Sequence, residues 1–349
     1  MERTDRLAYL DMAKGIGIIL VLFGHLEYTG QYVRVWISSF HMPLFFVIAG
    51  ITLSLGRADH SDVVSRIRRR ARGLLIPYAW FSAAYFVIDI GNMYLGKIDG
   101  HTFIVNAISS ITFYGKSVLW FITALFLSQV MLILLQKRIN DRGVILISIV
   151  VAAVAYFCSL ALTGAYEAHS DSLLITSVIN IGRTITRAGI VLIFVTLGYY
   201  GKRYADHIGF FEKPGYIRLI TGFALLAVNI PIALVNWSVD TNNMVLNNPF
   251  LYYAGSITGS LSIILLCSAV RDIPPLSYIG RNSLVIMAIH LDFYVLWAGL
   301  QVGKLVYRAV PFLPALTITT VIVTLILGCI ASYIVERFFP FVLGRKRSP

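Results

Sequence analysis

Long apolar runs follow one another along the whole 349-residue chain and are separated by short polar segments. A run of about twenty apolar residues has the length at which an α-helix crosses a bilayer. The pattern therefore predicts an all-α, polytopic membrane helix bundle of about ten transmembrane helices. It also predicts one transmembrane domain over residues 1–349, with no extramembrane domain. The predicted spans cover residues 8–28, 36–56, 74–95, 118–136, 143–163, 177–200, 217–236, 250–270, 283–300 and 314–335.

Composition supports a membrane location, and the basic residues orient the chain. Hydrophobic residues make up 58% of the sequence and charged residues 13%, about half the share found in soluble domains. If the N-terminus is cytoplasmic, 22 of the 29 Lys and Arg residues fall on the inner side of the membrane. The positive-inside rule therefore predicts that both termini are inside. Because the net charge of +12 is spread over short inner segments, it indicates topology and membrane lipid rather than nucleic acid. The three cysteines have no metal-ligand spacing, and we predict no metal site.

The first predicted span carries three polar side chains where such residues are costly. Asp11 and Lys14 lie toward its inner end, and ten uncharged residues separate Lys14 from His25. Eleven positions make three helical turns, so Lys14 and His25 return to the same face about 16 Å apart. A charged or imidazole side chain inside a span usually marks function. The alternatives are an interfacial ion pair between Asp11 and Lys14 and a structural role for the histidine.

An arginine cluster precedes the third predicted span. The stretch "RIRRRARG" at 66–73 forms the first inner loop and contains five arginines within seven positions. The planar guanidinium binds phosphate oxygens in a bidentate manner, which suits a phosphate-bearing donor. Arg68, Arg69 and Arg72 are the predicted phosphate ligands. The alternative is a topology signal or a patch for anionic lipid.

Several blocks together give the chain a resemblance to the acyltransferase family 3 membrane proteins, which include O-acetylases of surface polysaccharides. Each block is weak alone, but they occur in the family's order and reach from the first through the ninth predicted span. One departure is Lys14, which stands where the family usually has arginine and which lacks the guanidinium fork. The blocks are LDMAKGIGIILVLFGH, FHMPLFFVIAG, the arginine cluster followed by LLIPY, LWFITALF, LGYYGKR and IGRNSLVIMAIH.

The resemblance implies a multi-pass enzyme of a bacterial cytoplasmic membrane. It would move an acetyl or other short acyl group from cytoplasmic acyl-CoA to a hydroxyl of a cell-surface carbohydrate or its lipid-linked precursor. Acyl-CoA would be a substrate, and no bound cofactor is expected. His25, with Lys14 and Asp11, would form the catalytic centre, because an imidazole serves as a general base or as a transient acyl carrier. The acceptor's identity, the acyl group and the oligomeric state stay open.

Four further residues are expected on the acceptor side or near the reacting carbonyl oxygen. Arg183 and Arg187 lie one turn apart in the outer half of the sixth predicted span. His41 opens the second predicted span at the level of His25, and Trp120 is placed to stack on a sugar ring. The alternatives are snorkelling to lipid headgroups for the arginines and an ordinary interfacial role for His41 and Trp120.

On the donor side, Arg281 lies in a turn that enters the ninth predicted span, where we expect it to bind a further phosphate. The alternative for this turn is a helix cap by its Asn or Ser residue. His290 and Asp292 are expected to make structural hydrogen bonds. A small-molecule exporter that uses the same fold is the alternative function. No internal repeat in two halves, which is common in secondary transporters, is visible in the sequence.

Overall fold

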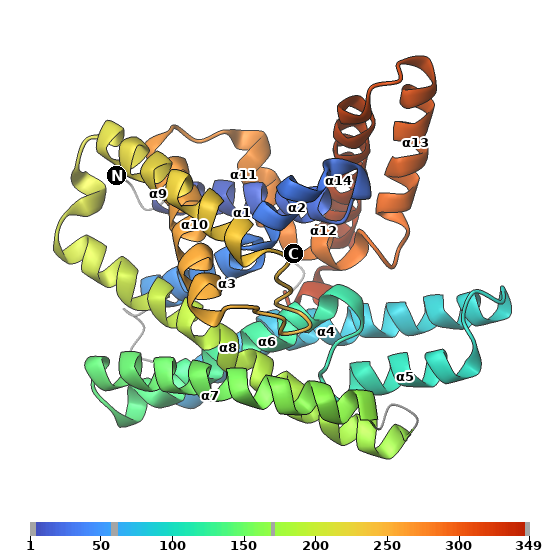
Figure 1. Ribbon diagram of the computed structural model, residues 1–349, viewed down its shortest axis with the longest axis horizontal. Helices are drawn as coiled ribbons and strands as arrows, with labels where there is room; N and C mark the ends of the chain where they lie inside the picture. The colour runs from blue at the N-terminus through green and yellow to red at the C-terminus, as the bar shows by residue number, and fades with distance from the viewer. Residues whose placement is uncertain (1–4, 57–61, 169–171, 346–349) are drawn as a thin grey trace. The chain divides into compact units, whose positions relative to one another are not determined.

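The computed structural model describes residues 5–56, 62–168 and 172–345, and these residues are almost entirely helical (Figure 1). Apart from one isolated bridge between Asp240 and Val245, the described residues contain no β-structure. The predicted all-α class is therefore confirmed.

The α-helices are α1 Asp5–Gly24, α2 Gln31–Ser38, α3 His41–Leu55, α4 Val63–Tyr94, α5 Gly100–Ile111, α6 Trp120–Arg138, α7 Asp141–Ala168, α8 Leu173–His207, α9 Gly215–Asn236, α10 Pro249–Ala269, α11 Pro274–Arg281, α12 Ser283–Ile289, α13 Val295–Ala309 and α14 Leu313–Phe338. Short 3-10 helices are η1 Glu27–Thr29, η3 Ser117–Leu119, η4 Phe210–Glu212 and η5 Pro340–Leu343.

Within the described ranges, eight helical segments are long and apolar enough to cross a membrane. They correspond to the second through eighth and the tenth predicted spans, and α1, with 20 residues, corresponds to the first. The protein is therefore a multi-pass helical membrane protein. The orientation with both termini inside stays a prediction.

The ninth predicted span, 283–300, is not one helix. It is divided into α12 and α13, which at 1.5 Å per residue are about 10 Å and about 22 Å long, too short to cross a bilayer. Tyr294 has a left-handed backbone, with φ of 60°, and the carbonyl of His290 accepts a hydrogen bond from the amide of Leu296 at 2.8 Å. Irregular backbone at membrane depth is tolerated only where it is buried in protein or lines a wet space. The segment that begins at His290 is therefore expected to be buried in protein or to line a wet space.

The chain forms two compact units, each assembled from separate stretches. The first unit comprises Met1–Leu55 and Leu197–Tyr333, and the second comprises Gly56–Thr196 and Ile334–Pro349. Both α8 and α14 contribute residues to each unit. The prediction of a single domain over 1–349 stays a prediction.

In the first unit, α1 packs against α2, α3, α10, α11 and α12, while α9 and α10 lie side by side (Figure 1). The crossing of α1 and α11 is unusually close. A Cβ at Gly280 would lie 1.7 Å from the carbonyl oxygen of Asp11, and one at Gly15 would lie 2.3 Å from that of Leu276. Glycine at both positions therefore lets the two backbones touch.

The second unit is held by contacts of α4 with α5, α6 and η5, together with the α6–α7 contact. Its buried polar centre is Asp89, whose carboxylate accepts from Lys116 at 2.6 Å and from the amide of Asn106 at 3.0 Å. The hydroxyls of Ser148 and Thr196 join α7 to α8 at 2.9 Å. Such pairing satisfies polar groups that would be costly in an apolar bundle.

Candidate active site

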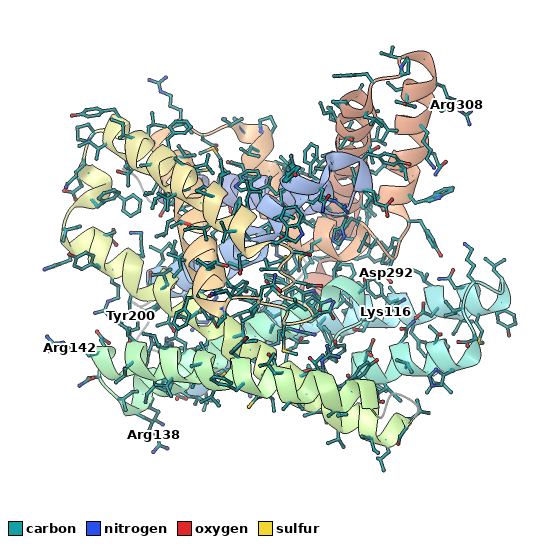
Figure 2. The ribbon with its side chains drawn as sticks, in the orientation of Figure 1. Lys116, Arg138, Arg142, Tyr200, Asp292 and Arg308 are labelled. Atoms are coloured by element: carbon teal, nitrogen blue, oxygen red, sulfur yellow. The ribbon has the colours of Figure 1, made fainter. Side chains whose placement is uncertain are left out.

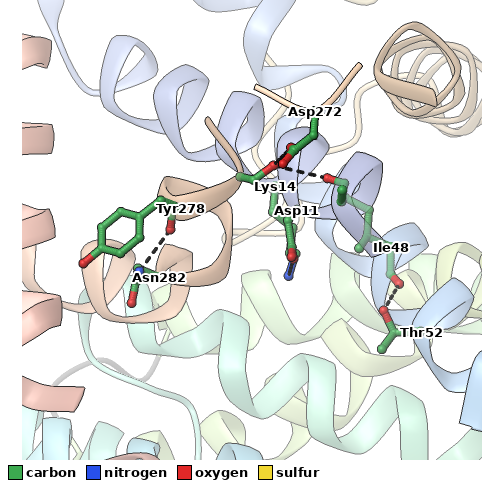
Figure 3. Close-up of polar contacts among 9 residues, drawn as sticks. Asp11, Lys14, Ile48, Thr52, Asp272, Tyr278 and Asn282 are labelled. Atoms are coloured by element: carbon green, nitrogen blue, oxygen red, sulfur yellow. Dashed lines mark hydrogen bonds and ion pairs between the residues drawn. The ribbon is translucent and has the colours of Figure 1, made fainter. Parts of the chain in front are cut away.

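Asp11 and Lys14 form an ion pair on successive turns of α1, with 2.6 Å between the carboxylate and the ammonium (Figure 3). Both side chains are partly buried. The ion pair considered in the sequence analysis is therefore present. Because Asp11 neutralises the lysine, a phosphate or a carbonyl oxygen that binds Lys14 has to compete with this carboxylate or bind beside it.

Arg281 ends α11 directly after the glycine that touches the α1 backbone, and its side chain is exposed. The crossing therefore brings the backbone of Arg281 close to the turn that carries Asp11. The neighbouring Asn282 donates its amide to the carbonyl of Tyr278 at 3.0 Å and does not cap α12 (Figure 3). The geometry does not support a capping role for Asn282, and it leaves Arg281 accessible to a ligand.

His25 follows the last residue of α1, and its backbone amide still donates to the carbonyl of Val21 at 3.2 Å. The helical register from Lys14 therefore extends to His25, as the predicted three-turn spacing requires. The two residues lie about 16 Å apart along the helix. The His25 side chain is exposed, so it is accessible to a substrate.

The ring of His25 lies against the ring of His290, with 5.1 Å between centroids and 47° between planes. His290 is 0% exposed, and its Nδ1–H donates to the carbonyl of Met287 at 2.6 Å. A carbonyl only accepts, so Nδ1 carries a proton, and in the neutral ring Nε2 then has the lone pair. Within the described chain, Nε2 has no hydrogen-bond partner. A buried acceptor is thereby held beside an exposed imidazole.

His41 opens α3 and donates Nδ1–H to the carbonyl of Ile37 at 2.8 Å. It lies near enough to His25 and Asp240 to interact with both electrostatically. Asp240 is held in turn by the backbone amides of Asn242 and Asn243 at 2.8 and 3.1 Å. The ring in contact with His25 is that of His290 rather than His41. His41 is therefore a neighbour of the histidine pair and not a part of it.

The arginine cluster is helical, which corrects its description as a loop before the third span. Asp62 caps α4 by accepting from the amide of Val64 at 3.0 Å, and arginine is a good helix former, so the helix begins before the cluster. The exposed arginines are Arg68, Arg69 and Arg72. Positions separated by three or four residues share a helix face, so Arg72 lies beside both of the others. Arg66 instead donates to Gln136 at 3.1 Å.

Arg183 and Arg187 are buried on α8 and are held by aromatic rings. The Arg187 guanidinium lies 4.5 Å from the centroid of Tyr114 and 5.1 Å from that of Trp120, and it donates to the Tyr114 carbonyl at 3.0 Å. The Arg183 guanidinium lies 5.1 Å from the Tyr114 centroid and 4.9 Å from that of Tyr166. The predicted residues Arg183, Arg187 and Trp120 therefore gather in one place.

Sequence reasoning assigned His290 a structural hydrogen bond, which is present, but it missed the contact with His25. It also missed Tyr114, which both arginines share. The only sequence signal for His290 was a histidine at the end of an apolar run in the block IGRNSLVIMAIH.

The sequence profile of acyltransferase family 3, described as an acyltransferase domain, matches residues 7–335. The chain belongs to this family. The match includes every candidate residue described above, and it establishes the resemblance drawn from the sequence blocks.

One curated relative of this acyltransferase-family chain is the nodulation protein NolL of Mesorhizobium japonicum (strain LMG 29417 / CECT 9101 / MAFF 303099). The two are 31% identical over 164 residues, which cover 44% of this chain and 42% of NolL. The chain thus matches less than half of that protein's length. No solved structure matches the chain.

Proposed function

We propose that this protein is a membrane O-acyltransferase that uses cytoplasmic acyl-CoA. The acyl group, acetyl or another short chain, would pass to a hydroxyl of a cell-surface carbohydrate or of its lipid-linked precursor. Family membership supports acyl transfer in general. The observation that carries the proposal is the exposed His25 imidazole packed against buried His290 at the end of α1.

In the base role, His25 takes the proton of the acceptor hydroxyl while the oxygen bonds to the thioester carbonyl carbon. The carbon–sulfur bond then breaks, and the CoA thiolate leaves and takes the proton from the imidazolium. In the carrier role, an imidazole nitrogen first bonds to the acyl carbon, the carbon–sulfur bond breaks, and CoA leaves as the thiolate. The oxygen of the acceptor hydroxyl then bonds to the acyl carbon, the carbon–nitrogen bond breaks to restore the imidazole, and the hydroxyl proton passes to the CoA thiolate. A positioned general base contributes about a hundredfold to ten-thousandfold in rate.

His290 is suited to position His25 in either role. Its Nδ1–H is engaged by the Met287 carbonyl, so in the neutral ring Nε2 acts as an acceptor. An N–H of His25 that turns toward Nε2 would leave the other nitrogen of His25 with its lone pair. That lone pair is the one a base or an acyl carrier requires.

The exposed arginines of α4, Arg68, Arg69 and Arg72, are proposed to bind phosphates of the donor. For Arg281 on α11, phosphate binding is proposed separately. Fixed guanidinium groups on one helix face suit the several phosphates of CoA. On α1, Lys14, which Asp11 pairs, is the cation proposed to act with His25. Lysine keeps the charge needed near a thioester oxygen but offers no bidentate contact.

Arg183, Arg187 and Trp120 are proposed to bind the acceptor. For His41, a role beside His25 is proposed separately. An export activity is the second candidate, because the break between α12 and α13 resembles the discontinuous helices that form transporter sites. Acyl transfer consumes acyl-CoA, whereas export does not, so one preparation can distinguish the two functions.

The test uses the full-length protein in proteoliposomes with radiolabelled acetyl-CoA outside and membrane glycolipids from the source cells in the bilayer. Acyl transfer predicts label in a lipid or glycan fraction as an ester that hydroxylamine releases. An exporter predicts no such ester and no consumption of acetyl-CoA. Empty liposomes provide the control for non-enzymatic acetylation.

A further inference from the structure

One face of α8 carries polar side chains over about three turns of helix. Its members recur every three or four positions and are almost inaccessible, with exposures of 2%, 1%, 6%, 3% and 0% in chain order. They are Thr176, Asn180, Arg183, Thr184 and Arg187. The opposite face presents apolar side chains, including Leu174 and Val178, to the surroundings. The helix thus turns its polar face into the protein, which is the expected arrangement for a membrane helix that lines a functional site.

Several of these polar groups have no partner within the part of the chain that the structure describes. These are the Thr176 hydroxyl, the Asn180 side-chain oxygen and the Nε of Arg183, together with the side-chain oxygen of Gln129 on α6. Thr184, in contrast, donates to the carbonyl of Asn180 at 2.8 Å. An unpaired buried polar group is costly, so several along one face indicate that a group outside the described residues satisfies them.

Among the groups on this face of α8 that lack a hydrogen-bond partner in the described chain, Arg183 most strongly indicates a bound ligand, because its side chain is charged and buried. Its described contacts are with the rings of Tyr114 and Tyr166, and no described carboxylate pairs with it. A ring face compensates a guanidinium only partly. A buried cation is among the costliest groups in a membrane protein, and since no described residue supplies a counter-ion to Arg183, a bound anion would reduce that cost.

The loop that supplies Tyr114 is held in an unfavourable backbone conformation. Phe113 and Ser117 have φ values of 58° and 52°, and Gly115 between them has φ of 81°. Left-handed backbone is unfavourable for a bulky residue such as phenylalanine and persists where the surroundings require it. The same loop places the Tyr114 ring against both arginines.

We propose that this polar face of α8, with Tyr114 and Tyr166, binds a glycoside that carries an oxyanion beside its hydroxyl groups. The guanidinium of Arg183 matches a phosphate or a carboxylate. The amide of Asn180, the amide of Gln129 and the hydroxyl of Thr176 match sugar hydroxyls. The assignment of this ligand as the acyl acceptor rests on the proposed function, whereas anion binding at Arg183 does not.

Calorimetry with three sugars tests the site on the full-length protein in detergent without any acyl donor. The probes are glucose, glucuronate and glucose 1-phosphate at one ionic strength. At least one anionic sugar should bind more tightly than glucose, and the tighter of the two identifies the oxyanion. Replacing Arg183→Gln should weaken that binding about tenfold to a hundredfold, as expected for a hydrogen bond to a charged group.

Arg142→Gln is the matched control, because Arg142 is an exposed arginine at the start of α7 (Figure 2). This variant should bind all three sugars like the unmodified protein. Thermal unfolding of each variant checks that it is folded.

A second variant separates a binding site from a structural feature. Asn180→Asp is nearly isosteric and places a carboxylate three positions before Arg183, where it can pair with the guanidinium. It should raise the unfolding temperature and abolish the preference for the anionic sugar. A structural role for Asn180 predicts the reverse, because a new buried charge would then lower the unfolding temperature.

The inference is overturned if glucose binds as tightly as both anionic sugars, if none of the three binds at millimolar concentration, or if both α8 variants keep the anion preference. The acyl-transfer assay is independent of this result. Arg183-dependent anion binding without any acyl transfer would refute the proposed function and leave the anion site standing.

Discussion

His290→Asn tests whether the buried histidine positions His25. The amide nitrogen of asparagine takes the place of Nδ1 and can keep the 2.6 Å bond to the Met287 carbonyl, whereas nothing replaces Nε2. His290→Gln does the opposite, since its longer side chain reaches the Nε2 position but leaves Nδ1 unreplaced. The two variants therefore remove the two functions of one ring separately.

The expected magnitudes follow from these contacts. In the proposed arrangement, in which His25 turns an N–H toward Nε2 of His290, the loss of that neutral hydrogen bond costs about 0.5–1.5 kcal/mol, and a misplaced catalytic group loses up to about a hundredfold in rate. For His290→Asn we expect kcat to fall about tenfold to a hundredfold, with unchanged KM for acetyl-CoA and a small loss of stability. For His290→Gln we expect the larger loss of stability, about 1–3 kcal/mol, because a buried carbonyl loses its donor, and a smaller loss of kcat.

Acetyl transfer in proteoliposomes gives kcat and KM, and thermal unfolding in detergent gives the stability of each variant. A variant that loses kcat but keeps most of its stability is a result that a purely structural histidine would not give. If His290→Asn transferred acetyl at the unmodified rate, or if both variants lost activity in proportion to stability, the positioning role would be wrong.

The remaining predictions concern the donor site and the helix crossing. Replacing Arg68, Arg69 and Arg72 together with Gln should weaken acyl-CoA binding at low salt, and less so at high salt, where screening already reduces these contacts; unchanged affinity in equilibrium binding would leave topology as the role of the cluster. Gly280→Ala should lower the unfolding temperature, because its Cβ would lie 1.7 Å from the Asp11 carbonyl and force α11 away from α1, a cost of about 1–3 kcal/mol or more. An unfolding temperature equal to that of the unmodified protein would contradict this, because it would show that α1 and α11 can move apart without a loss of stability.

Much of the architecture could be predicted from the sequence, because apolar runs in a membrane have few alternatives to a helix. The break before α13 could not, since residues 283–289 have the same apolar character as a continuous span. The left-handed Tyr294 that precedes α13 has no local signal such as glycine. The helical start of α4 was recognisable in principle, because Asp62 is a capping residue and the arginines after it favour helix.

The candidate residues were predicted more readily than their partners. Lys14, His25, Arg183 and Arg187 stand out because polar residues are rare in apolar spans. The contact of His25 with His290 depends on how α1 packs against α11 and α12, and one sequence does not encode such a long-range contact in any local pattern. Spacing also could not indicate that a single ring, Tyr114, would contact both arginines.

The central claim is that the His25 imidazole carries out acyl transfer, and the transfer assay on one variant tests it most directly. His25→Gln keeps a similar size and a hydrogen-bond donor but cannot accept a proton near neutral pH or carry an acyl group. We predict that it inserts, binds acetyl-CoA like the unmodified protein and transfers label at least about a hundredfold more slowly. His41→Gln is the control variant, because it changes a histidine near His25 that is not part of the ring contact between His25 and His290. If His25→Gln kept a sizeable fraction of the transfer rate, the imidazole would be only a structural donor, and the account would be wrong.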